Sequence, residues 1–305
     1  MSTNNKPLVV TVIVHFNTPI ECLQLINDLQ TITWPNHKIV IVDNQSEEGY
    51  FEYLKIELEH SNVTLIRNTV NNGYGGGINY GVSQIQNLKA DFYQILNTDT
   101  RIFNPDYISQ LIQGFFVNQG VGLIGPGVKI SNGEIQNTVM PFVSIIGILS
   151  RNIPKKSFIS SSPSFKKIEV INGVCFLISS KAFIKIGGFD QDFFMYGEEH
   201  DLCYRLKKNG FDSYFWSGPS IIHLNEIQTQ SEKKITWRDT LIMSNQVLLL
   251  KKHNSFVSAM FISFIFSISI IIKYFSGVKF PDTPLLVTIQ GLFKPEKMNN
   301  YIKNR

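Results

Sequence analysis

Short apolar runs alternate with longer helical patterns through the first hundred residues. Continuous runs of β-branched and aliphatic residues predict strands buried on both faces over 8–14, 38–42, 63–66 and 92–96. Helical patterns follow the first two strands, over about 19–31 and 47–59, and a third helix is expected to begin near Gly77. Strands and helices in alternation indicate an α/β fold, in which helices cover both faces of a mostly parallel sheet.

The pattern is less regular after residue 120. Residues 141–165 are rich in Ser, Pro and Lys and could form a mobile loop over a site. The remaining elements are predicted as strands over 121–130, 169–179 and 211–216 and helices over 180–186 and 199–208, with a hairpin turn at 131–133. The strand at 211–216 is expected to end before Gly218-Pro219.

The last seventy residues are helical and unusually apolar. A helix is predicted over 236–253, and residues 255–272 follow it without a charge, flanked by basic residues at 251–253 and by Lys273. This length is marginal for a membrane span, which needs about 20 apolar residues. The serines of the stretch do not share one helical face. A buried helix, a dimer interface, shallow membrane contact with lysines at the headgroups, and a span all fit this pattern.

Polar side chains follow each of the first four predicted strands. They are His15 and Asn17, Asp43 and Asn44, Arg67 and Asn68, and Asn97 and Asp99. In open α/β sheets, ligands bind beyond the carboxyl ends of the strands. Polar residues also end strands for purely structural reasons, but four such ends in succession favour a shared ligand site.

Asn97-Thr98-Asp99 is the first candidate motif. A divalent cation on a diphosphate needs hard oxygen ligands, usually one or two carboxylates. Asp99 could instead cap the next helix, but Asn104 is the better cap, with Pro105 at the first helical position. Asp99 is therefore free to bind a metal ion.

The Asn- and Gly-rich segment 71–79 is the second motif. Glycines let a backbone approach a ligand closely and adopt positive φ. The segment follows the third strand, and no acidic residue about 20 positions later suits a ribose, so it is not a dinucleotide fingerprint. A flexible turn and a diphosphate-binding loop both fit.

The acidic segment Gly197-Glu198-Glu199-His200-Asp201 is the third motif. Carboxylates so close in sequence repel one another, and a helix start, where the dipole favours negative charge, is one reason for them to gather. A general base aimed into a cleft is the other. His223 follows a short apolar run, and an isolated histidine is more often structural than a ligand.

Composition narrows the classes of function. Of 305 residues, 43% are hydrophobic and 17% charged, which indicates a folded chain with a substantial core. A net charge of +4 gives no sign of nucleic-acid binding. Cys22, Cys175 and Cys203 are widely spaced and read as core residues rather than a disulfide or zinc framework. The polar start, Met1 to Pro7, lacks an apolar signal region, so a cytoplasmic protein is expected.

These motifs together resemble the family 2 glycosyltransferases with the GT-A fold, and among them the bacterial rhamnosyltransferase-type members that build cell-surface polysaccharides. The resemblance covers about Leu8 to Asn254. It rests on five segments in this order: 11–17, 41–43, 71–79, 95–99, and 187–190 followed by 194–205. It implies a Rossmann-like GT-A catalytic domain over 1–235, with a nucleotide-sugar half to about 120 and an acceptor half after it. Residues 236–305 would form a C-terminal helical extension.

The resemblance also implies residue roles. Asp43 matches the position that pairs with the nucleotide base, and Asn97-Thr98-Asp99 stands where many relatives have DxD, with one carboxylate fewer here. Asp99 and His223 would hold Mg²⁺ or Mn²⁺. Glu199 matches the catalytic base, although it is Glu where Asp is usual, so Glu198 is the alternative; Asp201 orients the neighbouring helix or contacts the acceptor. Donor contacts are expected at His15, Asn17, Asp43, Asn44, Arg67, Asn71, Gly73, Gly76, Asn79, Asn97, Thr98 and Gly173.

The function expected from this resemblance is inverting transfer of a sugar from a nucleotide diphosphate to a hydroxyl of a lipid-linked or growing surface glycan. Rhamnose from dTDP-rhamnose is the first candidate donor, and UDP-sugars are the next. Peripheral contact with the cytoplasmic face of the inner membrane through 251–273, and a homodimer, are further expectations. The rivals are a sugar nucleotidyltransferase, which would want a Gly-rich basic loop after the first strand, and a non-catalytic glycan- or nucleotide-binding subunit.

Overall fold

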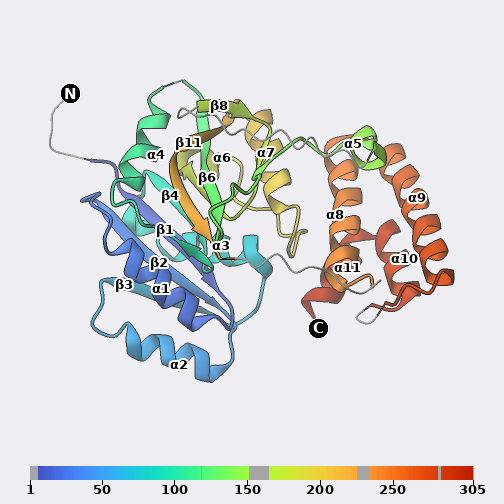
Figure 1. The fold of residues 1–305 in the computed structure, drawn as a ribbon, viewed down its shortest axis with the longest axis horizontal. Helices are drawn as coiled ribbons and strands as arrows, with labels where there is room; N and C mark the ends of the chain where they lie inside the picture. Colours follow the sequence, from blue (N-terminus) through green and yellow to red (C-terminus); the bar gives the residue numbers. More distant parts are fainter. Residues whose placement is uncertain (1–5, 118, 151–164, 225–233, 281–282, 305) are drawn as a thin grey trace.

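A twisted sheet of parallel strands forms the N-terminal half of the protein. The computed structural model describes residues 6–117, 119–150, 165–224, 234–280 and 283–304. Strands lie in the order β3 (Val63–Asn68), β2 (His37–Asn44), β1 (Val9–His15) and β4 (Phe92–Asn97), and every neighbouring pair is parallel. The four predicted strands are confirmed, and their carboxyl ends meet at one edge (Figure 1).

The sheet continues beyond β4 with mixed directions. β10 (Cys175–Ser179) runs antiparallel between β4 and β6 (Val121–Ile130). β11 (Asp212–His223) is parallel to β6, while β5 (Thr100–Arg101) and β8 (Phe165–Ile168) pair with it in antiparallel fashion. The expectation of a mostly parallel sheet therefore holds for the first half only.

Helices cover both faces, as expected. One face carries α1 (Pro19–Leu29), α2 (Glu48–Glu57) and α4 (Tyr107–Phe115) over a core that includes Cys22 and Cys175. The other carries α3 (Gly73–Gln84), α6 (Ser180–Lys185) and α7 (Glu198–Lys208) over a core that includes Cys203. All three cysteines are free and buried, which confirms their reading as core residues. A short 3₁₀ helix, η1 (Gln86–Leu88), leads into β4.

Several predicted boundaries were wrong. The helix after β3 begins at Gly73 and not near Gly77. Its glycines lack side chains, so neighbouring parts of the protein can pack closely against this first turn. β11 runs through Gly218-Pro219 by shifting register between Trp216 and Ser220. The strand predicted over 169–179 is split into β9 (Val170–Ile171), which pairs with β7 (Val139–Met140), and β10.

Two further local predictions also need correction. α4 begins at Tyr107 with Asp106 at its N-cap; Asn104 Oδ1 instead accepts from the Asp106 backbone N–H at 3.0 Å, which tightens the turn before the helix. The stretch predicted as a loop over 141–165 contains helix α5 (Ile145–Ser150), and its residues 151–164 lie outside the described residues.

The described residues after 235 form a group of packed helices, called here the C-terminal helical unit, beside the sheet and its helices (Figure 1). They are α8 (Trp237–His253), α9 (Phe256–Phe275), α10 (Leu285–Phe293) and α11 (Pro295–Lys303). α8 starts with a capping box between Thr236 and Asp239. α5 packs on α8 and α9 through Ile145 and Ile148, so the middle of the chain also contributes to this layer.

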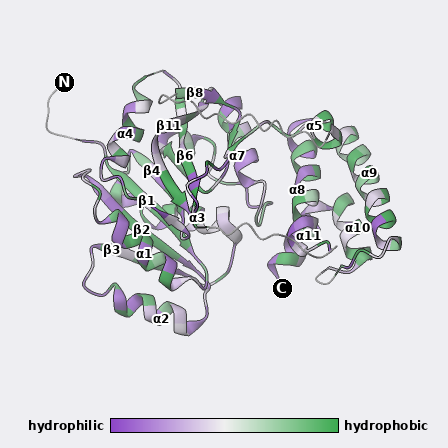
Figure 2. Cartoon of the chain, viewed as in Figure 1, coloured by the Kyte–Doolittle hydropathy of each residue, from purple (hydrophilic) through white to green (hydrophobic). Residues whose placement is uncertain are grey.

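Helix α9 exposes most of its large apolar side chains, while two of its serines are buried with Ala259, Ile262 and Ile270. Ser263 and Ser267 face inward, where their hydroxyls donate to helix carbonyls. Large apolar side chains face outward: Phe256, Val257, Met260, Phe261, Phe264, Ile268, Ile271, Ile272 and Phe275. Figure 2 shows how hydrophobic this helix is along its length. Among the described residues it is the one helix long and apolar enough to cross a membrane, and 28% of its apolar window is buried.

Candidate active site

A buried histidine and aspartate join the ends of β1 and β2. His15 Nδ1 lies 3.0 Å from Asp43 Oδ1, and both side chains are fully buried. The Thr18 backbone N–H donates to His15 Nε2, so Nε2 is the acceptor and Nδ1 carries the proton that Asp43 accepts. Burial alone raises the pKa of Asp43, but donors from His15 and Ser46 outweigh it and leave this pKa below its ordinary value.

A second layer of contacts ties the first loop to β3. Asn17 has a positive φ of 56°, and its Oδ1 accepts from the Glu47 backbone N–H. Arg67 Nε lies 3.7 Å from Asp43 Oδ2, and its Nη1 pairs with Glu48 at 2.8 Å. Its guanidinium also lies over the Phe51 ring. The site residues predicted at these three strand ends are therefore brought together at one edge.

Asparagine side chains hold the start of the glycine-rich segment. Asn44 Nδ2 donates to Asn71 Oδ1 and to the Gly73 carbonyl, and Asn68 Nδ2 donates to Asn44 Oδ1. Asn79 Oδ1 and Nδ2 are both used by the backbone of Phe189. In this structure, the amides of Asn44, Asn71 and Asn79 therefore bind other parts of the protein.

The glycines let α3 approach its neighbours closely. A Cβ on Gly73, which has φ of +74°, would collide with the Phe194 carbonyl, and one on Gly76 would lie 2.7 Å from Asn72 Cβ. The segment predicted as either a turn or a diphosphate loop is thus a helix N-terminus, where backbone N–H groups and the dipole favour an anion.

Tyr74 is a site residue that the sequence reasoning missed. Its hydroxyl donates to the Gly173 carbonyl at 2.9 Å. Burial raises the pKa of Tyr74 well above its ordinary value, and the nearby carboxylates of Glu199, Glu198 and Asp99 raise it further. Tyr74 thus lies between the acidic motif and the end of β4. Its position inside the 71–79 motif was the available signal.

Asp99 and His223 meet at the end of the sheet. Asp99 Oδ2 lies 3.2 Å from His223 Nε2, and the Leu224 backbone N–H donates to the Asp99 carbonyl. His223 Nδ1 lies 2.8 Å from Gln136 Oε1, an acceptor, so Nδ1 is the donor in that contact. Nothing local in the sequence marks Gln136, because it comes from the turn region after β6.

Residues 97 and 98 complete this edge. The Asn97 backbone N–H donates to the Val174 carbonyl at 3.1 Å, and the Thr98 and Thr18 hydroxyls lie 3.2 Å apart. These contacts fix the end of β4 between the loop after β1 and the residues before β10.

Glu198 and Glu199 differ in their surroundings at the start of α7. Glu198 is 2% exposed, and its Oε2 has no hydrogen-bond partner among the described residues. Burial, together with the neighbouring Glu199, raises the pKa of Glu198 well above its ordinary value. Burial also raises the pKa of Glu199, although the backbone N–H groups of Gly173 and Gly197 oppose this shift.

Gly173 fixes the position of the Glu199 carboxyl group. The Gly173 N–H donates to Glu199 Oε1 at 3.0 Å, and a Cβ at residue 173 would collide with that carboxyl. The loop 172–174 between β9 and β10 therefore brings the predicted donor-sugar segment against the predicted base.

Asp201 binds Arg205 and His253 rather than the residues around Glu199. Its Oδ2 binds Arg205 Nε at 2.7 Å and its Oδ1 binds His253 Nε2 at 2.7 Å. With 1% exposure it links α7 to α8. Of the two roles predicted for Asp201, the orientation of a neighbouring helix has these contacts behind it.

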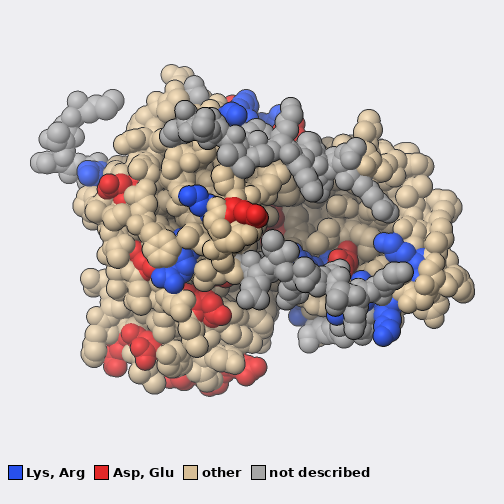
Figure 3. Space-filling view, viewed as in Figure 1, with Lys and Arg blue, Asp and Glu red and all other residues tan. Residues whose placement is uncertain are grey.

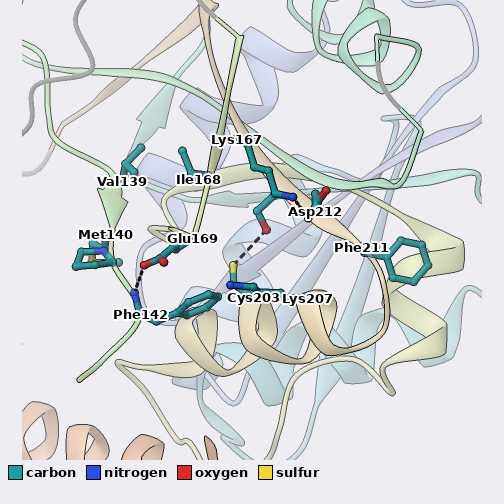
Figure 4. Close-up of a pocket in the computed structure, with 12 residues that line it drawn as sticks. Val139, Met140, Phe142, Lys167, Ile168, Glu169, Cys203, Lys207, Phe211 and Asp212 are labelled. Atoms are coloured by element: carbon teal, nitrogen blue, oxygen red, sulfur yellow. Dashed lines mark hydrogen bonds and ion pairs between the residues drawn. The ribbon is translucent and has the colours of Figure 1, made fainter. Parts of the chain in front are cut away.

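A cavity of about 390 Å³ lies beside α7 (Figure 4). Cys203 and Lys207 line it, four and eight residues after Glu199 and so on roughly the same side of the helix. Figure 4 shows Met140, Phe142 and Glu169 together on one side, where Glu169 accepts from the Phe142 N–H. The cavity thus combines aromatic, basic and acidic groups one to two helical turns from the acidic motif.

Comparison with known families decides the class of protein. The family model described as "Glycosyltransferase like family 2" matches residues 7–241, which is more than three quarters of the chain. The chain belongs to this family. The resemblance stated from the motifs is therefore confirmed.

Curated relatives include rhamnosyl- and hexosyltransferases at low identity. The N-acetylglucosaminyl-diphospho-decaprenol L-rhamnosyltransferase of Mycobacterium tuberculosis is 24% identical over 204 residues, which cover 61% of this chain and 66% of that protein. The low-salt glycan biosynthesis hexosyltransferase Agl10 of Haloferax volcanii is 26% identical, with 69% and 68% covered. The chain thus spans about two thirds of the length of these relatives.

Solved glycosyltransferase structures share the fold. GalNAc-T7, solved with UDP, GalNAc and Mn²⁺, has a TM-score of 0.60 at 16% identity, with 80% of this chain and 48% of that chain covered. The mannosyltransferase PcManGT of Pyrobaculum calidifontis, solved with GDP-Man and Mn²⁺, has a TM-score of 0.56 at 12% identity, with 99% and 85% covered. The fold of this family member is GT-A, as expected.

Proposed function

We propose that this protein is a metal-dependent, inverting glycosyltransferase that uses a nucleotide-diphosphate sugar. The observation that carries the proposal is the convergence of Asp99 and His223 at the end of the sheet, with Tyr74 and Gly173 linking that end to Glu199. The sugar class follows the names of its relatives, among which rhamnosyltransferase recurs. We take dTDP-rhamnose as the first candidate donor and UDP-sugars as the next.

Asp99 and His223 would serve as two ligands of a divalent cation. Gln136 Oε1 can accept the Nδ1–H of His223, and Nε2 would then offer a lone pair towards Asp99 Oδ2, 3.2 Å away. Two electron-pair donors face each other stably when a cation or a proton lies between them. When bound, Mg²⁺ or Mn²⁺ would supply charge stabilisation to the leaving diphosphate. With two protein ligands, the site would depend on donor phosphates to complete the coordination.

The donor would lie along the carboxyl edge of β1 to β4. Asn17 after β1, Asp43 at the end of β2 and Arg67 at the end of β3 would surround the nucleoside end. The diphosphate would meet the N-terminus of α3, whose backbone N–H groups and dipole favour an anion. Because Asp43 is buried and already accepts from His15 and Ser46, recognition of the base through Asp43 requires its Oδ2 to exchange the weak 3.3 Å contact with Ser46.

Glu199 would act as the general base. Its carboxylate takes the proton of an acceptor hydroxyl while that oxygen forms a bond to the anomeric carbon. The bond from the anomeric carbon to the diphosphate oxygen breaks, and the nucleoside diphosphate leaves with the electron pair. One displacement inverts the anomeric centre. Glu198 fits this role less well, because it is buried with a strongly raised pKa.

The acceptor would use the cavity beside α7. This cavity starts one turn beyond Glu199, and its Phe142 ring stacks on Tyr204 with 3.9 Å between ring centroids and lies under the Lys207 ammonium. A lysine beside the cavity suits a diphosphate. The mycobacterial relative is named as a transferase that acts on N-acetylglucosaminyl-diphospho-decaprenol, which supports a lipid-linked acceptor.

The C-terminal helical unit would contact an anionic membrane surface. Residues 236–305 contain nine Lys and Arg against three Asp and Glu, a net charge of +6, whereas residues 1–235 contain 19 against 21, a net charge of −2. Figure 3 shows basic side chains on this unit and acidic ones around α2 at the far end. The outward apolar face of α9 together with Ile146 and Leu149 of α5 would enter the headgroup region. In this arrangement the protein would lie at the cytoplasmic face of the membrane, with a homodimer through α9 as the competing arrangement.

Nucleotide-sugar turnover tests the proposal. The purified protein would be incubated with Mn²⁺ and, separately, with dTDP-rhamnose, UDP-glucose, UDP-galactose and UDP-N-acetylglucosamine, and release of nucleoside diphosphate would be followed. Slow hydrolysis of one donor, lost with EDTA, is expected. Pyrophosphate-dependent formation of a nucleoside triphosphate would indicate a nucleotidyltransferase instead. Tight nucleotide binding with no turnover of any donor or acceptor would indicate a binding subunit.

A further inference from the structure

The loop before the acidic motif has an unusual backbone. Tyr196 has φ of 64° and Gly197 has φ of 115°, so two successive residues lie in the left-handed region. Such conformations cost free energy in a residue with a side chain and persist when neighbouring structure holds them. Because Glu198 and Glu199 follow directly, the conformation of residues 194–197 sets where their carboxyls point.

Two buried asparagines of the C-terminal helical unit hold this loop. Asn245 Nδ2, on α8, donates to the carbonyls of Met195 and Tyr196 at 2.8 and 2.6 Å. The Phe194 backbone N–H donates to Asn299 Oδ1, on α11, at 2.8 Å. Asn299 Nδ2 donates to Asn245 Oδ1 at 2.7 Å and to the Pro295 carbonyl at 3.1 Å.

This network is buried, and its amide groups are fully paired. The side chains of Asn245 and Asn299 are 1% and 4% exposed, and each of their four amide N–H bonds has an acceptor. A buried polar network in which every member is satisfied fixes one arrangement of the groups it joins. Three backbone groups of the 194–197 loop are thereby fixed to two asparagines that lie 49 or more residues later in the chain.

The same loop also contacts the donor side. The Phe194 carbonyl accepts from the Tyr74 N–H at 3.2 Å, next to Gly73, whose lack of a side chain allows that approach. The loop therefore lies between the N-terminus of α3 and the C-terminal helices. A shift of the loop would move Glu199 relative to the donor site.

We infer that Asn245 and Asn299 are positioning residues for the general base Glu199. The inference rests on the proposed function, since it assumes that Glu199 is the base. It gives the C-terminal helical unit a direct role in the reaction besides any contact with a membrane. A base displaced by about 1 Å loses on the order of 100-fold in rate, while donor binding at the other strand ends is left alone.

The test compares Asn245→Ala and Asn299→Ala with Ser244→Ala. Ser244 is a matched control, because its buried hydroxyl donates to the Gly291 carbonyl at 3.0 Å within the same unit and does not contact the loop. For each variant, kcat, the KM and Kd for the donor, and the melting temperature would be measured. Asn245→Ser, which keeps one donor, covers the case in which Asn245→Ala does not fold.

The asparagine variants should lose about 10- to 100-fold in kcat with an unchanged donor Kd. Ser244→Ala should lower the melting temperature without changing kcat, and Asn245→Ser should be intermediate. The double asparagine variant should lose little more than either single one, because the two amides act together. The inference is overturned if the asparagine variants melt earlier, as Ser244→Ala does, yet keep their kcat, or if donor affinity falls by the same factor as kcat.

Glu199→Gln is measured in the same series to separate two failures. If Glu199→Gln is inactive while the asparagine variants keep full kcat, the positioning inference fails and the proposed function stands. If Glu199→Gln is fully active, Glu199 is not the base, and the positioning inference fails with that assignment.

Discussion

Glu198 and Glu199 are neighbours in the sequence but have different surroundings in the structure. Glu198 is sealed inside, with one carboxyl oxygen unpartnered among the described residues, while Glu199 is partly exposed and accepts the Gly173 N–H. The sequence alone leaves both glutamates open as the base. Adjacent residues on a helix project their side chains in different directions, and the sequence does not show which of the two faces the cleft. The distinction depends on Gly173, whose missing side chain makes room for the Glu199 carboxyl.

Glu198→Gln should stabilise the protein at high pH. The folded-state pKa of Glu198 is raised, so the folded state holds the proton more tightly than the unfolded state does. The contribution of Glu198 to stability is therefore fully present below the ordinary Glu pKa and is lost as pH rises through the raised folded-state value. An amide at residue 198 cannot ionise and removes this loss.

Thermal unfolding of wild type and Glu198→Gln from pH 5 to pH 9 measures the effect. The difference in melting temperature should grow in favour of the variant as pH rises. A difference that is constant across this range would mean that Glu198 is not held in its protonated form. Glu21→Gln, on the surface of α1 with no resolved contact to the motif, serves as a control.

Gln136→Ala should weaken metal binding although Gln136 contacts no metal ion. Gln136 fixes the orientation and tautomer of His223, and loss of such a partner typically costs about 10- to 100-fold in metal affinity. Calorimetric titration of nucleoside diphosphate with and without Mn²⁺ measures it. Asp99→Ala should remove the Mn²⁺-dependent part of binding, and exposed Ile135→Ala should change nothing. Equal Mn²⁺ enhancement in wild type and Asp99→Ala would rule out this metal site.

At the scale of elements, hydrophobic periodicity and runs of β-branched residues correctly predicted the parallel strands. The four parallel strands lie where the runs were found, and their polar ends share one edge. Predictions failed where long-range contacts decide. Gly73 to Gly77 are helical because the helix packs against Phe189, Phe194 and Val14, none of which is a neighbour in sequence. β11 crosses Gly218-Pro219 because β6 pairs with it on both sides of the shift.

The buried face of helix α9 could not be predicted from the sequence either. Its serines are scattered along the sequence, yet Ser263 and Ser267 both face the interior, so the outward face is almost wholly apolar. In water a helix is stabilised by the opposite arrangement. The neighbours that accept the serine hydroxyls, among them the Leu292 carbonyl of α10, come from the fold and could not be inferred from the pattern.

The triple variant in which Phe261, Phe264 and Ile268 are replaced by serine should no longer bind anionic vesicles. These side chains are 48%, 60% and 41% exposed, so the substitutions should leave the fold intact while removing the apolar contact. Cosedimentation with vesicles of phosphatidylglycerol and phosphatidylcholine measures binding. Phe116→Ser, 77% exposed at the end of α4, is the control. Unchanged vesicle binding by the triple variant, together with a change from dimer to monomer in solution, would support the homodimer instead.

At the scale of the molecule, the C-terminal helical unit is joined to the α/β part of the protein at several points. Asn245 and Asn299 hold the 194–197 loop, His253 binds Asp201, and Lys252 pairs with Asp190 and Asp192. The sequence favours a division at about residue 235, because composition changes there. These contacts run across that division, and they join residues too far apart in the chain for any local pattern to reveal.

Residues 1–235 expressed alone should fold less stably and transfer sugar far more slowly than the full chain. The fragment lacks both asparagines that hold the loop before Glu199, while its strand-end donor site is complete. Donor affinity and kcat measured on the fragment and the full chain should differ mainly in kcat, by at least about 10-fold. A fragment with the kcat of the full chain would show that the helical unit is an appendage.

The steady-state rate of Glu199→Gln at saturating donor and Mn²⁺ tests the central claim most directly. The account predicts that Glu199→Gln loses about 100- to 10,000-fold in kcat, the usual contribution of a general base, and binds the donor as wild type does. Glu198→Gln, measured beside it, should keep most of its activity, because Glu198 is buried and its pKa is raised, so it is the less suitable base. A Glu199→Gln variant that transfers sugar at the wild-type rate while Glu198→Gln is inactive would contradict the account.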